Sequence, residues 1–246
     1  MIIVAGLGLG LWPGPPEGRA ESACALEPVF SQAGVPVRRV SGTSALIFEA
    51  GLAIDADGAP DAYHPDDLGT DRLKNAGRPG RWRGIVTHNG KPDGRPLVQG
   101  PGDPRPGYHV SQTSLFNPDR KRTDPARYVD SNQTPYVALP ARFLDLVHLG
   151  DFGLVFHRLS GRYSGAIFAD VGPDDILGEG SIALARALGV PSCPREGGTE
   201  EDTGIVYLLF PGSGNQKPRS LGEIWFESER LFRTFGGWAR LAECLD

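Results

Sequence analysis

The segment 168–181, FADVGPDDILGEGS, holds two carboxylates in surroundings that suit chemistry. Asp170 ends the apolar run GAIFAD, so we expect a core strand to fix its position while its side chain meets solvent. Glu179 lies between Gly178 and Gly180 at the start of an expected helix, and these glycines would leave space for a bulky ligand. Hydrolysis of a glycosidic bond needs one carboxylic acid and one carboxylate in such a pair. Helix starts also attract carboxylates for dipole reasons, so a solvated turn is the alternative.

The hydrophobic pattern predicts the elements that position this pair. Strands are expected at 35–40, 45–58, 101–116, 134–140 and 204–210, hairpins at 81–100 and 152–170, and helices at 66–77, 181–189 and 221–246, the last interrupted at 236–237. The 34 Gly and 22 Pro are spread along the chain, which favours many turns and short strands over long helices. We predict one mainly β domain with a few short helices over residues 26–246. Its expected core is a strand-rich barrel, with a double-psi arrangement as one candidate.

The first residues of the chain have the pattern of an export signal. Residues 1–25 begin with the apolar stretch MIIVAGLGLGLW, which is too short to span a bilayer as a helix. Small residues ahead of Glu21 and of Leu26 fit the rule for signal-peptidase cleavage, although no Lys or Arg precedes the apolar stretch. We therefore expect residues 1–25 to be a leader, the protein to be secreted, and no membrane partner.

Charge and cysteine content narrow the class of ligand. The net charge of −5 argues against a nucleic-acid partner, which would require a basic face, and is compatible with a cationic ligand. Cys24, Cys193 and Cys244 lack metal-site spacing, and no His or Cys motif for a metal occurs, so we expect no metal and no cofactor. In an exported protein Cys193 could form a disulfide with Cys244. Cys24 would then remain unpaired, unless the pairing is a different one that includes it. Buried free thiols are an equal alternative.

Four motifs in order resemble glycoside hydrolase family 75, the chitosanases best known from fungi. GAIFADVGPDDILGEGSIALARALG is similar to the family's signature region, in which a strand ends in Asp and a Gly-rich turn leads through Gly-Glu into a helix. LAIDADGAP is similar to its Asp-Ile-Asp-Cys-Asp-Gly segment, with Asp55 and Asp57 on the matching positions. DSNQTPYVALP and GIVYLLFPGSG resemble two further segments, and together the motifs cover roughly residues 47 to 214.

The resemblance implies an endo-acting, inverting chitosanase whose two essential carboxylates map onto Asp170 and Glu179. The chain departs from the family at ADVGP, where the polar neighbours of the Asp are replaced by Val171 and Pro173, and at Ala56, where the family has Cys. From the residues themselves, a strand-end Asp near solvent should stay ionised and act as base. Glu179, close to the apolar helix entry, is then the expected proton donor with a raised pKa.

Four more residues are candidates for contact with the substrate. Asp55 and Asp57 lie two apart on an expected strand, so both would point to one face of a cleft and hold the amino groups of glucosamine units. A calcium-like or solvated DADG turn explains them equally well. Tyr63 and His64 could offer a ring face and a hydrogen bond to a sugar, with a structural turn as the alternative for His64.

These observations predict a secreted, monomeric hydrolase that cleaves β-1,4 linkages in chitosan or a related amino-sugar polymer. One alternative is a non-catalytic protein that binds amino-sugar glycans. Another is an enzyme that cleaves the same linkage in peptidoglycan, whose acetylated sugars offer no ammonium groups to the acidic residues.

Overall fold

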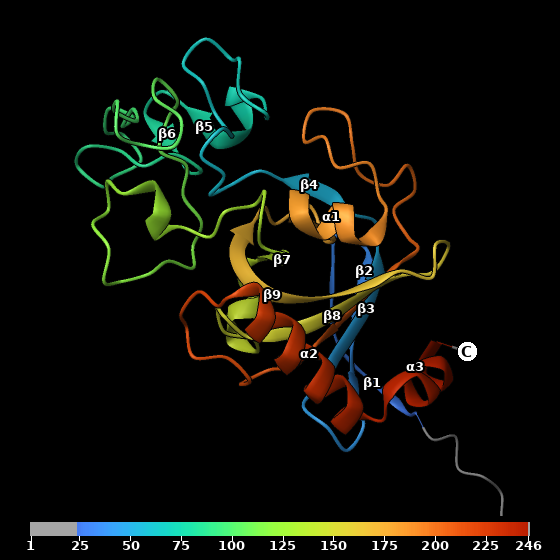
Figure 1. Cartoon of the computed structure of the whole chain (residues 1–246). Helices are drawn as coiled ribbons and strands as arrows, with labels where there is room; N and C mark the ends of the chain where they lie inside the picture. Colours follow the sequence, from blue (N-terminus) through green and yellow to red (C-terminus); the bar gives the residue numbers. More distant parts are fainter. Residues whose placement is uncertain (1–23, 246) are drawn as a thin grey trace, which may run out of the picture.

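The structure is a computed structural model that describes residues 24–245 (Figure 1). The expected leader, residues 1–25, therefore lies outside the described residues except for its last two positions. None of the helices within residues 24–245 is long and apolar enough to cross a membrane.

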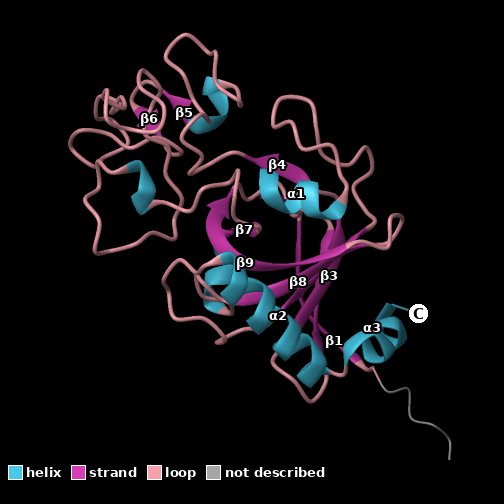
Figure 2. Ribbon diagram, in the orientation of Figure 1, coloured by secondary structure: helices cyan, strands magenta, loops and turns pink. Residues whose placement is uncertain are grey.

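The core of the protein is a mixed sheet of nine strands in the order β1-β2-β3-β11-β8-β9-β7-β10-β4. Figure 2 shows the strands in magenta, with helix α2 (Leu221–Phe235) in cyan packed against them. The β7/β9 and β10/β4 pairs are parallel, and the other neighbours are antiparallel. The strands are β1 (Leu26–Gln32), β2 (Val35–Val40), β3 (Leu46–Ala50), β4 (Ala53–Asp55), β7 (Tyr136–Pro140), β8 (Phe152–His157), β9 (Tyr163–Gly172), β10 (Glu179–Ser181) and β11 (Ile205–Leu209).

The mainly β prediction is confirmed, but the expected barrel does not close in the described part of the chain. The sheet begins at β1 and ends at β4, and these two edge strands do not pair with each other. β4 is three residues long, and the loop around Thr199 runs beside it. Thr199 donates its N–H to the carbonyl of Leu52, and its hydroxyl accepts from the Leu52 N–H. A loop rather than another strand therefore occupies this edge.

Both faces of the sheet are covered, because the buried strand β11 alternates between two clusters. Ile205, Tyr207 and Leu209 face the cluster that contains residues of α1 (Ile182–Leu188). Ser181 caps the start of this helix and Gly189 caps its end, in agreement with the helix expected at 181–189. Val206 and Leu208 face the other cluster, which contains residues of α2 (Leu221–Phe235) and α3 (Gly237–Leu245). The amphipathic pattern of 221–246 and its break at the two glycines are thus confirmed.

A long segment with little regular structure, residues 56–135, connects β4 to β7 and lies beside one end of the sheet (Figure 1). It contains η1 (Leu73–Ala76), β5 (Gly77–Arg78), β6 (Arg81–Trp82) and η2 (Pro125–Arg127); η3 (Ala141–Asp145) follows β7. The hairpin expected at 81–100 and the strand at 101–116 are wrong. Apart from β6, which pairs with β5, the described structure has only isolated bridges there, such as Thr87 with Pro96 and Val98 with His109. Prolines and glycines interrupt the ladder, because proline lacks a donor and glycine weakens a strand.

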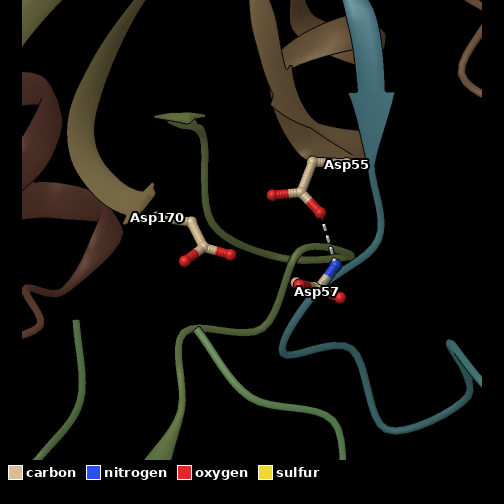
Figure 3. Close-up of side chains that lie close together, drawn as sticks. All are labelled: Asp55, Asp57 and Asp170. Atoms are coloured by element: carbon tan, nitrogen blue, oxygen red, sulfur yellow. Dashed lines mark hydrogen bonds between the residues drawn. The ribbon is translucent and has the colours of Figure 1, made fainter. Parts of the chain in front are cut away.

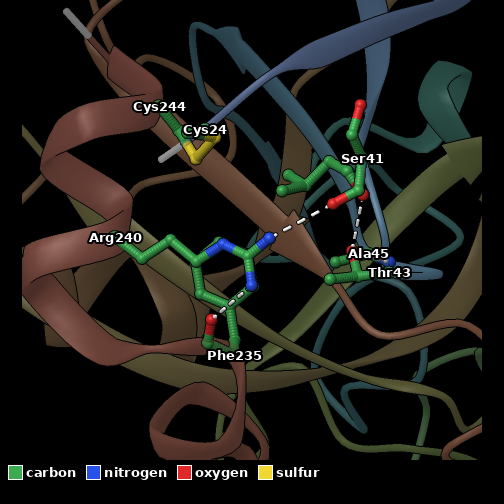
Figure 4. Close-up of a disulfide and its surroundings, with 8 residues drawn as sticks. Cys24, Ser41, Thr43, Ala45, Phe235, Arg240 and Cys244 are labelled. Carbon is green, nitrogen blue, oxygen red and sulfur yellow. Dashed lines mark hydrogen bonds between the residues drawn. A yellow bond between two sulfur atoms is a disulfide. The ribbon is translucent and has the colours of Figure 1, made fainter. Parts of the chain in front are cut away.

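A disulfide joins Cys24, ahead of β1, to Cys244 in α3 (Figure 4). The expected pairing of Cys193 with Cys244 is therefore wrong, and Cys193 is an exposed free thiol. Cys24 and Cys244 belong to the hydrophobic cluster beneath α3, whereas Cys193 lies on the loop that follows α1. Arg240 reinforces the same corner by donating to the carbonyls of Phe235 and Ser41.

We expect Cys244→Ser to lower the melting temperature, because the disulfide closes a loop with a sequence separation of 220 residues. Native disulfides contribute about 2–4 kcal/mol in such cases. Thermal unfolding without reductant measures the loss, and Cys193→Ser is the matched control that should melt like the wild type. Equal melting temperatures for Cys244→Ser and the wild type would contradict the structural role of this bond.

Candidate functional site

A β-bulge in β9 decides the face of the sheet on which Asp170 emerges. In the β7–β9 ladder, Val137 is opposite Phe168, but the next residue, Ala138, is opposite Asp170. Ala169 is thus an extra residue, and Asp170 shares a face with Ala138 although simple alternation would place it with Phe168. The packing agrees, because Phe168 and Val137 lie in the cluster beneath α1, whereas Ala169 lies in the cluster on the opposite face.

Glu179 reaches the same place from the other side of β7. It begins β10 and is also paired with Ala138, so Asp170 and Glu179 flank one small residue on one face. Strands are about 4.8 Å apart, which separates the two backbones by about 10 Å. The Glu179 side chain leans back across Ala138, since a Cβ added at Gly172 would lie 2.4 Å from its Oε2. Gly172 is two residues beyond Asp170 on β9, a distance of about 7 Å along a strand.

The glycines on either side of Glu179 serve packing rather than ligand access. A Cβ at Gly178, which has φ of 100°, would lie 2.3 Å from the carbonyl oxygen of Gly51. A Cβ at Gly180 would lie 2.7 Å from Leu184 and 2.9 Å from the carbonyl oxygen of Tyr136. The expectation that these residues make room for a ligand is therefore wrong, and Gly172 is the residue that leaves space for the Glu179 carboxylate.

Asp55 and Asp57 converge on Asp170 from the end of β4 and the turn that follows it (Figure 3). The Asp57 N–H donates to Oδ1 of Asp55 at 2.8 Å, and the Tyr63 hydroxyl donates to Oδ1 of Asp57 at 2.6 Å. One carboxylate oxygen from each of the three aspartates lies within 4.8 Å of the others. A hard cation prefers such oxygens, but three are fewer than the six to eight that Ca²⁺ takes, so water would have to complete a coordination shell.

Burial raises the pKa of every carboxyl in this group. It raises the pKa of Asp55 to about 7, with the nearby Asp170 charge as the second cause. The pKa of Asp57 is well above its usual range because of burial and the charges of Asp55 and Asp170. Burial and the same two charges hold the pKa of Glu179 well above its usual range. Burial and mutual repulsion therefore shift each of these carboxyls toward its protonated form.

Asp170 differs from the other carboxyls because three donors stabilise its ionised form. Its Oδ1 accepts from the Ser114 N–H at 2.9 Å, the Ser114 hydroxyl at 2.6 Å and the Val171 N–H at 2.8 Å. The pKa of Asp170 is still raised, because burial outweighs the hydrogen bonds that lower it. Asp170 is buried, so the expectation that its side chain meets solvent is wrong. Ser114 thus provides a hydroxyl beside Asp170, although the polar residues that the family has after this Asp are absent from ADVGP.

The carboxylates line one cavity of about 390 Å³ at the junction of the sheet with segment 56–135. Its lining includes Asp55, Asp57, Tyr63, Asp170 and Glu179. The structure therefore brings five of the six predicted site residues together. The sixth, His64, is outside the lining; its ring lies edge-on to Tyr108 at 4.9 Å, and its Nδ1 accepts from the Asp66 N–H. His64 is thus a turn residue here. Tyr63 reaches the cavity as a fully buried hydroxyl donor rather than as an open ring face.

Three residues of the site were not predicted. Ser114 holds Asp170 from 56 positions away in sequence, and no local pattern indicates that contact. Asp71 is buried in the cavity wall, where Asn75 donates to it at 2.8 Å, and burial raises its pKa. Arg83 is the only basic residue that lines this cavity in the described structure. Their common signal is their position in a Gly- and Pro-rich segment, which predicts loops but not what the loops contact.

A comparison with known protein families and with curated proteins found no match to this chain. The resemblance to glycoside hydrolase family 75 therefore stays a prediction that its four motifs carry.

We expect Asp55→Asn to change how stability depends on pH. A carboxyl with a folded pKa of about 7 favours folding while it is protonated, so its contribution is lost as the pH rises from about 4, the unfolded value, through 7. Asn keeps an oxygen for the Asp57 N–H but cannot ionise. The difference in melting temperature between Asp55→Asn and the wild type should be more favourable to the variant at pH 8 than at pH 5. Asp119→Asn, at an exposed position, should show no such change with pH. Parallel curves for wild type and Asp55→Asn would contradict the shifted pKa.

Proposed function

We propose that this protein is a secreted, monomeric glycoside hydrolase that cleaves β-1,4 linkages within chitosan or a related amino-sugar polymer, with inversion at the anomeric carbon. The observation that carries the proposal is the placement of Asp170 and Glu179 on the same face, opposite the same residue of β7, in one cavity. The motif resemblance to family 75 supports it independently, because it selects the same two residues.

The chemistry requires both carboxyls at once. Glu179 donates its proton to the glycosidic oxygen as the bond to the anomeric carbon breaks, and Asp170 takes a proton from the water that attacks the opposite side of that carbon. The products are a new non-reducing end and a hemiacetal of inverted configuration, and both carboxyls exchange their protonation states. Inverting enzymes need about 6.5–9.5 Å between the two carboxyls. The backbones of Asp170 and Glu179 lie about 10 Å apart, one strand on either side of Ala138, which is compatible with that requirement.

The two environments favour this division of roles. Glu179 accepts no hydrogen bond within the described part of the chain that would stabilise its charge, and burial raises its pKa, which suits a proton donor. Asp170 receives three donors on Oδ1, which favour the ionised form that a base requires. Asp57 and Asp55 are too close to Asp170 for a water to attack between them, and their role is to hold the substrate and tune the pair.

The charge of the cavity supports a cationic substrate. Five carboxyls and one guanidinium line it: Asp55, Asp57, Asp71, Asp170, Glu179 and Arg83. An ammonium group beside these carboxyls would lower their pKa values, and the ionised carboxylates would attract it. This mutual stabilisation is expected for glucosamine units. An uncharged acetylated sugar gains no such stabilisation.

The test of the catalytic pair uses isosteric variants. Glu179→Gln and Asp170→Asn should each reduce chitosan cleavage by about 10²–10⁴-fold, the usual contribution of a positioned acid or base. Both should still bind chitosan oligomers. Asp174→Asn, at an exposed position of the same segment, is the matched control and should keep full activity. Release of reducing ends measures the rate, and NMR of the first product gives its anomeric configuration.

Wild-type rates in both Glu179→Gln and Asp170→Asn would overturn the catalytic assignment. A wild-type protein that binds chitosan oligomers without cleaving them would instead support the non-catalytic glycan-binding alternative.

Secretion gives a prediction about the mature N-terminus. Cleavage before Glu21 keeps Cys24, whereas cleavage before Leu26 removes the residue that pairs with Cys244. We therefore expect N-terminal sequencing of protein from the culture medium to begin at Glu21. A start at Leu26 would contradict the disulfide as a feature of the mature protein, and active intracellular protein with an intact Met1 would contradict export.

A further inference from the structure

A second cavity of about 400 Å³ adjoins the catalytic one on the side of segment 56–135. The two cavities share Asp57, Arg83, Asp170 and Val171 in their linings, so they meet at the proposed base. The second cavity differs in charge, because its remaining lining contains no further acidic residue in the described structure and adds two arginines, Arg122 and Arg127. The combined cleft is therefore acidic at one end and basic at the other.

The three arginines of the second cavity keep their charge available. None of them forms an ion pair with a carboxylate in the part of the chain that the structure describes, where seven other arginines do. Arg122 donates from Nη2 to the carbonyl of His88 at 2.8 Å. Arg127 donates to the carbonyl of Asn117 at 3.1 Å and covers the Phe116 ring at 4.0 Å. These neutral partners fix the guanidinium groups without neutralising them.

The shape and lining of the cavity suit a sugar. Phe116 is 39% exposed and gives an apolar surface, Gln112 and Thr113 add polar groups, and Tyr128 closes the wall. A pocket with a few convergent polar groups and an aromatic wall is typical of a small-ligand site. The guanidinium groups favour a sugar with a carboxylate, because arginine binds carboxylates with paired, charge-assisted hydrogen bonds.

We propose that this second cavity is a subsite for a sugar that carries a carboxylate, next to the sugar whose linkage is cleaved. The inference rests on the proposed function and narrows its substrate class to amino-sugar polymers that bear both ammonium and carboxylate groups. A chain with only ammonium groups would place positive charge against three arginines in this cavity. A chain with both groups matches the acidic end and the basic end together, which also fixes its direction in the cleft.

Arg83 is the best residue for the test, because it lines both cavities, is exposed, and its side chain donates no hydrogen bond to the rest of the described structure. Arg83→Gln removes the charge and keeps a polar side chain, and Arg83→Glu reverses the charge. Arg81→Gln is the matched control, since Arg81 is exposed two positions away and lines neither cavity. Melting temperatures verify that each variant is folded.

Binding is measured by calorimetry in the Glu179→Gln background, so that hydrolysis does not consume the ligand. The ligands are glucosamine hexamers, the same hexamers oxidised to carboxylates at C6, and partly deacetylated peptidoglycan strands freed of peptides, which carry lactyl carboxylates. We expect the background protein to prefer at least one carboxylated ligand over the plain hexamer. Arg83→Gln should reduce that preference by about tenfold, the effect of losing one charge-assisted contact, and Arg83→Glu should reduce it further. Arg81→Gln should leave it unchanged.

The carboxylated ligand that shows the preference identifies the source, a uronic-type carboxylate or a lactyl ether. Equal binding of plain and carboxylated ligands, or a preference that survives Arg83→Gln and Arg83→Glu, overturns the subsite. Failure of the proposed hydrolysis is a separate result, because it would appear as uncleaved substrate with the wild type while the Arg83-dependent preference in binding persisted.

Discussion

The extra residue at Ala169 is the constraint on which the arrangement of the site depends. Without it, Asp170 would follow Phe168 onto the face beneath α1 and would be separated from Glu179 by the sheet itself. With it, a row of paired positions across β9, β7, β10 and β4 carries Asp170, Ala138, Glu179 and Ala53 on one face. The small side chain of Ala138 keeps the space between the two carboxyls open. Bulges are common near functional sites because they redirect one side chain at little cost to the remaining ladder.

The same arrangement buries several carboxyl groups away from water, and residues of the loops donate hydrogen bonds to them. Asp55 and Asp170 are more than nine-tenths buried, and an unpaired buried carboxylate is strongly unfavourable. Segment 56–135 supplies the donors: Ser114 to Asp170 and Tyr63 to Asp57. Ser131 in the same segment joins the carbonyl of Asp55 to the start of α1 by accepting from the Ile182 N–H. Segment 56–135, which has little regular structure, therefore supplies hydrogen-bond donors that hold the acidic group together.

Sequence-based prediction succeeded for the sheet and its helices and failed for the loops of segment 56–135. The strands around 134–140, 152–170 and 204–210 and the helices at 181–189 and 221–246 were predicted because periodicity records which side chains are buried. Asp170 and Glu179 were selected because an apolar run and flanking glycines mark them locally and because the resemblance to family 75 maps its two carboxylates onto them. The face on which Asp170 emerges could not be predicted, since a bulge leaves no periodic signal. Ser114 and Arg83 could not be found either, because their contacts depend on how proline-rich loops fold over the sheet. The barrel prediction was wrong because strand content does not determine whether the edges meet.

The disulfide between Cys24 and Cys244 has a topological consequence for the whole fold. It makes the backbone between these residues a covalent ring, because the bond lies at the two ends of the described chain (Figure 4). A single cut in any loop of that ring yields a nicked molecule in one piece, with new ends at the cut and the old ends still joined. The long segment over the cleft can therefore be clipped once without either fragment diffusing away. A single cut at any exposed peptide bond of the ring therefore gives a molecule connected like a circular permutant, in which the disulfide joins the original ends.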